Sequence, residues 1–447
     1  MKRYVVCALI LGSQAFAQTE TVMTLEQAIA LGRTSSRSLK ISAARADAAV
    51  AKAGEAETAL LPGLRFSGSY LRVSDGAFTL SVAGTPLLKN PPPVVVNNYV
   101  FRLGLQQPLF TGFRLSNSAK AAEYQAQAGI LQRDMDDADL VLGVTSAYWS
   151  LYQALQMQKY VDENVVRLES YQADTERLLK AGLATRNDLL KVQVQLATAR
   201  VTQIDARNDV QLAQLNLNNV IGQPLETTVI PSSDPQALMD TDTPEQGSRM
   251  SDLTSRAWEQ RKDLHAVSLL AEAARAGVNA ARGAYWPQID LLAAYNYNQP
   301  NSRYQPITNA FYSNWEIGVQ LQMDVWNWGR TARQTEQAEA VVSQNEQQLA
   351  QLKDNITLEV RRASLTLGRS REKLGVARLA VDQAEENRRM TTDRYRNGIA
   401  TSSDLLDAEV ALLQSKTNFT GAVVEYALAK ARLERAIGGA SAGEKHD

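Results

Sequence analysis

The sequence predicts a mainly α-helical protein that carries a smaller membrane β-barrel portion and is built from a duplicated unit. Three observations lead to this fold class. One motif occurs twice, short segments place apolar residues at every second position, and long segments have the heptad spacing of a coiled coil. Together they predict that each half of the chain contributes a β-hairpin and a long helical hairpin.

The duplication is clearest in a short motif. Residues 182–190 read GLATRNDLL, and residues 398–406 read GIATSSDLL. The same spacing carries Arg114 onto Arg330. An internal repeat of this kind constrains the architecture before any single motif does.

We expect five segments in the chain. They are a signal peptide at 1–17, a first structural repeat at 18–225, a linker at 226–250, a second repeat at 251–438 and a flexible tail at 439–447. The signal peptide is predicted from a basic start, a short apolar run and a small-residue cleavage site. That apolar run is too short to span a bilayer, and no later stretch has ~18 uninterrupted apolar residues, so no transmembrane helix is expected.

Composition narrows the classes of function. The only cysteine, Cys7, lies in the predicted signal, so we expect no disulfide and no lipid-acceptor cysteine in the mature chain. The 47 basic and 48 acidic residues are interspersed, which argues against a nucleic-acid partner. Two histidines, no HExxH or GxSxG arrangement and no phosphate-binding glycine motif predict neither an enzyme nor a metal or cofactor site.

Each half contains two segments whose apolar side chains alternate with polar ones. They cover 64–70 and 99–105 in the first half, and 289–297 and 315–325 in the second. Their length matches the ~9–11 residues of a tilted transmembrane strand, and aromatic residues such as Trp315 suit a membrane interface. A soluble sheet half buried on a core gives the same alternation, so this pattern by itself leaves both interpretations open.

Between the strands and the repeated motif the spacing changes to that of a helical seam. Apolar and small side chains alternate four and three residues apart through 124–152, again through 189–220, and in the second half through 405–433. Sustained heptads predict coiled-coil packing. The outgoing helix, from about Arg114 to about Ala181, would be ~100 Å long if unbroken.

Four membrane strands cannot close into a barrel by themselves. Bacterial barrels have about eight strands or more, and an open edge in lipid leaves backbone groups unpaired. We therefore expect copies of the chain to pool their strands. A barrel of about eight strands is filled by its own side chains, so a water-filled conduit favours three or more copies.

The sequence resembles the TolC family of outer-membrane efflux proteins over essentially the whole mature chain. Besides the duplication, the resemblance rests on LLP at 60–62, QPLF at 107–110, YWP at 285–287, RYRNG at 394–398 and DLLDA at 404–408. It implies a homotrimer with four strands per chain, which form a 12-stranded barrel in the outer membrane. A long helical coiled-coil barrel would continue it across the periplasm.

The resemblance also implies a function and partners. The trimer would be a passive exit duct of a tripartite efflux pump or a type I secretion system, opened at its periplasmic tip by an adaptor protein. An inner-membrane transporter would supply the energy, and outer-membrane lipid would surround the barrel. A coiled-coil scaffold without a pore, periplasmic or extracellular, is the alternative; it explains the heptads but not the strands. The cargo is not determined.

In the family, the turns that carry the repeated motif form the periplasmic tip, where acidic side chains narrow the pore. Matched residue by residue, Asp404 and Asp407 fall on the aperture acids, Asp188 on the first-half gate aspartate and Tyr395 on the gate tyrosine. Asp188 and Asp404 are also well placed simply to cap the returning helices. The position of the family's gate arginine is Ala400 here.

Two candidates remain to replace that arginine, Arg186 and Arg396. The tips carry further expected sites. We expect Gly182 and Gly398 to be helix C-caps in the left-handed conformation. The apolar residues that follow them, Leu183 and Ile399, would be presented to the adaptor or would pack on their own hairpins.

Overall fold

The computed structural model describes most of the chain. The described residues are 21–74, 81–82, 85–86, 95–233, 249–305 and 307–439. The predicted signal peptide and residues 440–447 of the predicted tail lie outside this part of the chain.

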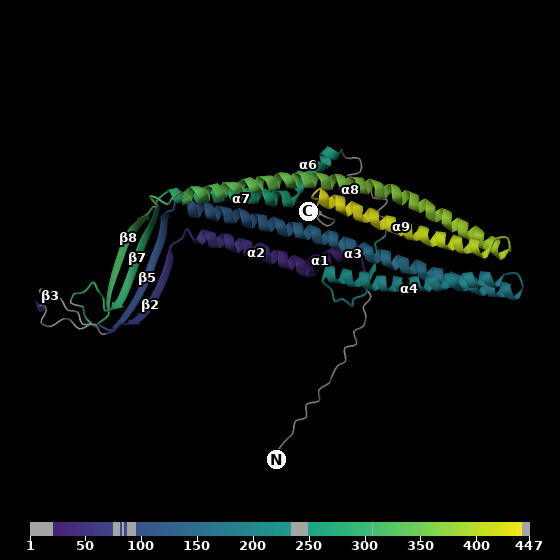
Figure 1. The fold of residues 1–447 in the computed structure, drawn as a ribbon, viewed down its shortest axis with the longest axis horizontal. Coiled ribbons are helices and arrows are strands. Elements are labelled where there is room, and N and C mark those ends of the chain that lie inside the picture. The colour runs from purple at the N-terminus through teal and green to yellow at the C-terminus, as the bar shows by residue number, and fades with distance from the viewer. Residues whose placement is uncertain are drawn as a thin grey trace, which may run out of the picture. The chain divides into compact units, whose positions relative to one another are not determined.

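The helices and strands follow the order that the duplication predicts (Figure 1). The first half contains β1 (Thr21–Met23), α1 (Leu25–Ser35), α2 (Arg37–Thr58), β2 (Gly63–Arg72), β3 (Ser81–Val82), β4 (Thr85–Pro86), β5 (Asn97–Phe110), α3 (Arg114–Lys180), α4 (Arg186–Ile221) and β6 (Val229–Pro231). The second half contains α6 (Met250–Gln260), α7 (Lys262–Arg282), the 3₁₀ helix η1 (Gly283–Tyr285), β7 (Gln288–Gln299), β8 (Tyr312–Gln322), α8 (Arg330–Arg396) and α9 (Ser402–Ala436).

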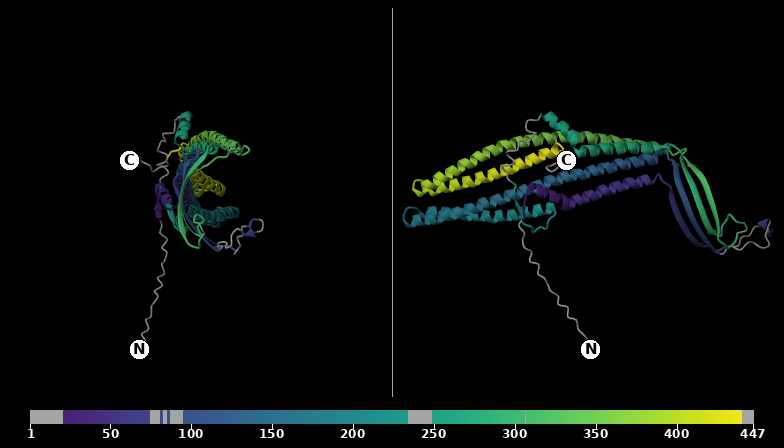
Figure 2. Two further views of the ribbon diagram at one scale, coloured as in Figure 1. Left: turned by 90° about the vertical axis from the view of Figure 1, so that its left-hand side faces the viewer. Right: turned by 180° about the vertical axis from the view of Figure 1, so that it is seen from behind.

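The two longest of these helices, α3 and α8, repeat each other. Both have 67 residues, and they begin at Arg114 and Arg330, the two arginines that the sequence repeat matches. Each is followed by a returning helix that lies beside it, α4 beside α3 and α9 beside α8 (Figures 1 and 2). The expected outgoing helix of the first half is therefore confirmed as one unbroken helix.

The chain divides into two compact units, and each contains segments of both halves. The helical unit comprises 21–42, 133–262 and 353–439, and the sheet unit comprises 43–132 and 263–352, as far as these ranges are described. The division differs from the two predicted repeats because the units group residues by contact, whereas the repeats group them by sequence.

The core of the helical unit is built around two aromatic residues of α3. Tyr148 and Trp149 are buried, with 0% and 1% of their surface exposed, and they pack with residues of α1, α4 and α9. The Tyr148 hydroxyl donates to the Met23 carbonyl oxygen at 3.0 Å and accepts from the backbone of Ser232 at 3.1 Å. It thereby fixes the parallel pair of β1 and β6 on the helices.

The sheet unit contains a four-stranded antiparallel sheet in the order β2-β5-β7-β8. The predicted hairpins are confirmed as the pairs β2–β5 and β7–β8, and β5–β7 pairing joins the two halves. The expected continuation of the last strand to Val325 is wrong, because β8 ends at Gln322. Its partner there is Gln288, and the residue before Gln288 is Pro287, which has no N–H to extend the ladder.

The two faces of this sheet differ in chemistry. One line of cross-strand neighbours runs Phe66, Leu103, Tyr295 and Trp315, and further along β8 the same face carries Ile317. These side chains are 42–71% exposed. An apolar face of this extent left uncovered marks an interaction surface, whereas a sheet half buried on a core would cover it.

The opposite face is polar. Arg102 and Glu316 form an ion pair at 3.1 Å across the sheet, and Glu316 also pairs with Arg303 at 2.7 Å. A sheet with one apolar and one charged face is typical of a membrane β-barrel, in which one face contacts lipid and the other faces a polar interior.

None of the described helices has the length and apolar character that crossing a membrane requires.

We expect a charge on the apolar face of the sheet to impair membrane insertion. Ile317→Lys, in the middle of β8, should lower the amount of protein in the outer-membrane fraction, because a lysine at mid-depth on a lipid face costs about 2–4 kcal/mol. The matched control is Gln320→Lys, on the polar face of the same strand opposite Asp290. Equal insertion of the two variants, measured by membrane fractionation, would contradict the assignment of the faces.

Candidate gate at the helix tips

The turns that join α3 to α4 and α8 to α9 have the same construction. Gly182 and Gly398 have φ angles of +74° and +71°. The N–H of the next residue donates back to the carbonyl of the helix's last turn, from Leu183 to Leu178 and from Ile399 to Arg394, at 2.8 Å in both turns. The prediction of left-handed glycine C-caps is therefore confirmed.

Each returning helix begins with a capping box. The Asp188 N–H donates to the Thr185 hydroxyl at 3.2 Å, and the Thr185 N–H donates to Asp188 Oδ2 at 3.0 Å. In the second tip Asp404 and Thr401 repeat this exchange at 3.2 and 2.8 Å. Asp188 and Asp404 thus cap their helices, whatever further role they have.

Capping favours the ionised form of both aspartates. Hydrogen bonds from Thr185 and then Ser402 lower the pKa of Asp188, and those from Thr401 lower the pKa of Asp404. A carboxyl group whose folded pKa is lowered stabilises the fold in its ionised form. That contribution is complete above the unfolded pKa of about 4 and is lost as the pH falls through the lower folded pKa.

The two tips are bound to each other within one chain. The Ser402 hydroxyl donates to Asp188 Oδ1 at 2.7 Å, and Lys191 Nζ donates to the Ser403 hydroxyl at 2.9 Å. Beneath these bonds lies a shared apolar core, the tip cluster, whose buried members come from both hairpins: Val165, Leu168, Tyr171, Val192, Leu196, Ala199, Tyr395 and Leu405.

The predicted gate residues differ in how many hydrogen bonds their side-chain oxygens form. Both carboxylate oxygens of Asp188 accept hydrogen bonds, whereas Asp404 uses only Oδ2 within the described part of the chain. Asp407 is exposed, and among the described residues it has no hydrogen bond or ion pair. Tyr395 is only 9% exposed, and its hydroxyl lies 3.0 Å from the Thr175 hydroxyl inside the tip cluster.

The expected docking residues are open to their surroundings. Leu183 is 77% exposed and Ile399 is 69% exposed, so the alternative that they pack on their own hairpins is wrong. Between the first turns of α4 and α9 lies an open groove of about 420 Å³. Its apolar lining consists of Leu190, Val194, Leu406 and Val410.

The residue at the expected position of the gate arginine and the two candidate replacements differ in exposure. Ala400 is half-buried against the tip cluster. Arg186 and Arg396 are exposed, and neither forms an ion pair with another described residue.

Sequence reasoning missed the partners Ser402 and Lys191. Their contacts join residues far apart in the chain, and no local pattern signals such a pair.

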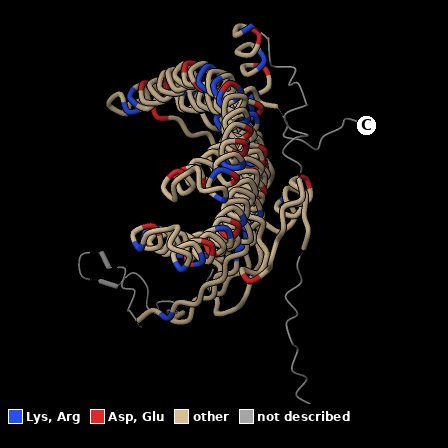
Figure 3. Tube along the Cα trace, turned by 90° about the vertical axis from the view of Figure 1, so that its right-hand side faces the viewer, with Lys and Arg blue, Asp and Glu red and all other residues tan. Residues whose placement is uncertain are grey.

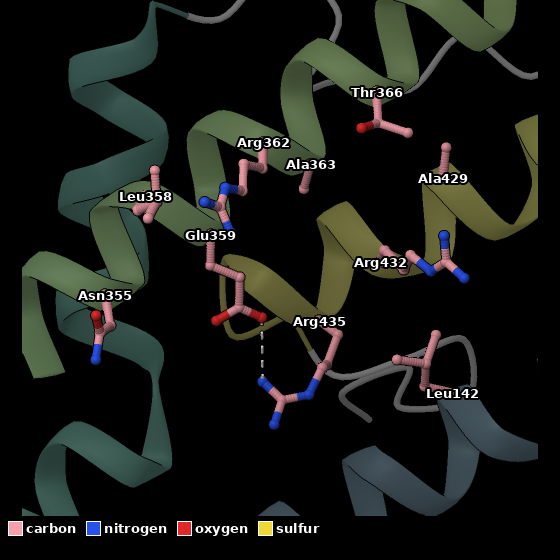
Figure 4. A pocket seen from close by; sticks show the side chains of 10 residues that line it. All are labelled: Leu142, Asn355, Leu358, Glu359, Arg362, Ala363, Thr366, Ala429, Arg432 and Arg435. Atoms are coloured by element: carbon pink, nitrogen blue, oxygen red, sulfur yellow. Dashed lines mark ion pairs between the residues drawn. The ribbon is translucent and has the colours of Figure 1, made fainter.

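Another cavity of the helical unit, of about 440 Å³, lies between α3, α8 and α9 (Figure 4). Arg362, Arg432 and Arg435 line it together with Glu359, whose Oε1 lies 3.8 Å from Arg435 Nη1. No group of three or more His, Cys, Asp or Glu side chains suited to hold a metal occurs in the described ranges. Basic and acidic residues are interspersed along the helices as a whole, as the balanced composition indicates (Figure 3).

The exposed apolar face of the sheet, the long helical hairpins and the capped, acidic tips are together typical of an outer-membrane channel protein. The chain belongs to the outer membrane efflux protein family, whose model matches residues 29–223 and 253–439. The protein is accordingly an outer-membrane protein that extends into the periplasm.

Individual relatives agree with the family. Over 322 residues the chain is 24% identical to outer membrane protein TolC of Vibrio cholerae, covering 72% of each chain. It is 25% identical to the alkaline protease secretion protein AprF of Pseudomonas aeruginosa, covering 75% of this chain and 69% of that one. The solved structure of the outer membrane protein VceC from Vibrio cholerae has the same fold, with a TM-score of 0.73 at 20% identity over 93% of this chain and 96% of that one.

The left-handed turn at the second tip can be tested with two glycine substitutions of opposite expected sign. Gly398→Ala should speed hydrogen exchange across the tip roughly fivefold, since a left-handed non-glycine residue costs about 1 kcal/mol. A Cβ there meets nothing within 4 Å, so strain in φ is the only cost. Gly368→Ala, at an exposed position inside α8 with equally open space, should slow local exchange, because alanine favours a helix by about 1 kcal/mol. Unchanged hydrogen exchange in Gly398→Ala would show that the left-handed turn at this residue does not stabilise the tip.

Proposed function

We propose that three copies of this chain form a passive exit duct of a tripartite efflux pump or a type I secretion system. The observation that carries the proposal is the sheet, which has one exposed apolar face and two outer strands, β2 and β8, that each pair with only one other strand among the described residues. In lipid, such edges have to be paired with further strands. Three chains pool twelve strands, enough to enclose a water-filled interior.

Exposed apolar side chains on the helices support the same assembly. On α4 they include Val194, Val201 and Ile204, which are 60–66% exposed. On α8 they include Leu365 and Val376, which are 73% and 71% exposed. Seams of this kind suit packing of α4 of one copy against α8 of the next, continuing the coiled-coil packing beyond a single chain.

The duct opens and closes at its tips in this proposal. The carboxylates of Asp404 and Asp407, repeated by threefold symmetry, form an acidic aperture. Leu183 and Ile399 dock the periplasmic adaptor, and an inner-membrane transporter supplies the energy. Support for the docking role comes from the 77% and 69% exposure of the two apolar side chains at the turns. Asp188 takes part in the gate by restraining the movement of the two tips of one chain relative to each other.

Disulfide trapping tests the trimer. Ser67→Cys in β2 is combined in turn with Asn314→Cys, Gly318→Cys or Gln320→Cys in β8, in a mature chain that is predicted to have no other cysteine. Within one chain β5 and β7 separate these strands by ~14 Å, too far for a disulfide. We expect at least one pair to yield a covalent trimer on a denaturing gel. Single-cysteine variants should stay monomeric. Products no larger than a dimer in all three pairs would overturn the trimer.

Charges at the tips should disrupt docking. Leu183→Asp and Ile399→Asp should each reduce export by the complete system without changing the amount of protein in the outer membrane, since a charge in an apolar contact has to be desolvated. Leu225→Asp is the control, because Leu225 is also an exposed leucine of the helical unit, at 52%, but follows the far end of α4. Normal drug resistance or secretion in both tip variants would remove the docking assignment.

Removing the aperture charges should change ion selectivity. In planar bilayers, Asp404→Asn/Asp407→Asn should lose cation preference and block by divalent cations. Its stability should fall only modestly, because asparagine at 404 loses the contribution of the ionised carboxylate but can still accept the hydrogen bond from the Thr401 N–H. Asp205→Asn/Asp209→Asn removes two exposed charges elsewhere on α4 and should behave as wild type. Unaltered ion selectivity of the Asp404→Asn/Asp407→Asn variant would refute the acidic aperture. A large loss of stability with unaltered conductance would mean that the two aspartates have a structural role only.

A further inference from the structure

A buried carboxylate connects the two helical hairpins above their tips. Glu409 of α9 is only 2% exposed. Its Oε2 accepts from Arg167 Nε of α3 at 2.8 Å, and its Oε1 accepts from the Tyr171 hydroxyl at 2.9 Å. Arg388 Nη1 of α8 lies 3.8 Å from the same Oε1. One side chain of the second hairpin is thus held by two groups of the first.

The contacts of Glu409 with α3 are followed, toward the tip, by polar contacts between α3 and α8. The hydroxyls of Tyr171 and Thr392 lie 3.4 Å apart, and nearer the tip the hydroxyls of Thr175 and Tyr395 lie 3.0 Å apart. Arg167, Tyr171 and Thr175 share one face of α3 because they are spaced four residues apart. Burial raises the pKa of Tyr171, so its hydroxyl stays protonated and donates.

An ion pair in this position restricts the helices more than apolar packing would. Apolar side chains tolerate sliding, whereas a buried carboxylate that leaves its partners is uncompensated and strongly destabilising. Any movement that separates the two hairpins has to remove Glu409 from Arg167 and Tyr171 or carry all three together. The contact therefore favours one relative position of the hairpins.

A second ion-pair site on α9 provides a comparison. Glu425 pairs with Arg369 at 2.6 Å and with Lys373 at 2.6 Å, and both cations belong to α8. Glu425 therefore links α9 to the other helix of its own hairpin, whereas Glu409 links it to the other hairpin.

We propose that Glu409 is a positioning residue that holds the first helical hairpin against the second and keeps the tip closed. Together with Arg167 it supplies a restraint between the two hairpins of one chain. The inference rests on the proposed function as a duct gated at its tips. It assigns the closed position to an ionic contact inside each chain.

Single-channel conductance of the purified full-length protein in planar bilayers tests this role. Glu409→Gln nearly preserves shape and should raise the mean conductance several-fold, because the hairpins separate more readily. Glu425→Gln removes one carboxylate from the same helix and should conduct as wild type. Arg167→Gln should open the channel as Glu409→Gln does, whereas Arg167→Lys, which keeps the cation, should remain largely closed.

The double variant Arg167→Gln/Glu409→Gln separates a shared contact from two independent effects. If the two residues act through one link, the double variant should conduct no more than either single variant. Additive increases, or wild-type conductance of Glu409→Gln and Arg167→Gln alike, would overturn the positioning role. If Glu409→Gln does not insert, the contrast between Arg167→Gln and Arg167→Lys decides the question. A wild-type protein that forms no pore would instead overturn the proposed function.

Discussion

The unpaired edges of the four-stranded sheet are the constraint on which the rest of the structure depends. β2 and β8 each present backbone N–H and C=O groups to one side, and the sheet's apolar face suits lipid, where such groups find no water. Pairing of β5 with β7 merges the two hairpins of the duplicated chain into one sheet but leaves these edges. In the proposed trimer, association of copies would pair these edges and enclose a channel.

The aspartates at the two tips have the same local structure but different surroundings. Asp188 and Asp404 occupy the same place in two capping boxes, so local helix chemistry requires an acceptor at each. They differ in what remains free. The second carboxylate oxygen of Asp188 accepts a hydrogen bond from Ser402 of the other tip. One carboxylate oxygen of Asp404 accepts no hydrogen bond from a described residue. The duplication supplied two equivalent aspartates, and their surroundings give them different hydrogen-bond partners.

The contact of Glu409 with Arg167 gives a physical account of how the hairpins of one chain keep their register. Coiled-coil seams supply most of the apolar packing, but they resist sliding weakly compared with a buried charge that has to keep its partners. A duct whose tip has to open needs hairpins that move between defined positions. Polar contacts beneath the apolar surface suit that requirement better than a continuous apolar core.

The sequence by itself determined everything that local rules govern. Alternation indicated the four strands of the main sheet, heptads indicated the long helices, and Gly182 and Gly398 marked both turns, because each feature depends on neighbours within a few residues. Only the tertiary structure decided the β5–β7 pairing, the end of β8 at Gln322 and the bond from Ser402 to Asp188. Glu409 is the clearest case. In sequence it is one more acidic residue on a helix, and its burial arises only when α3, α8 and α9 come together.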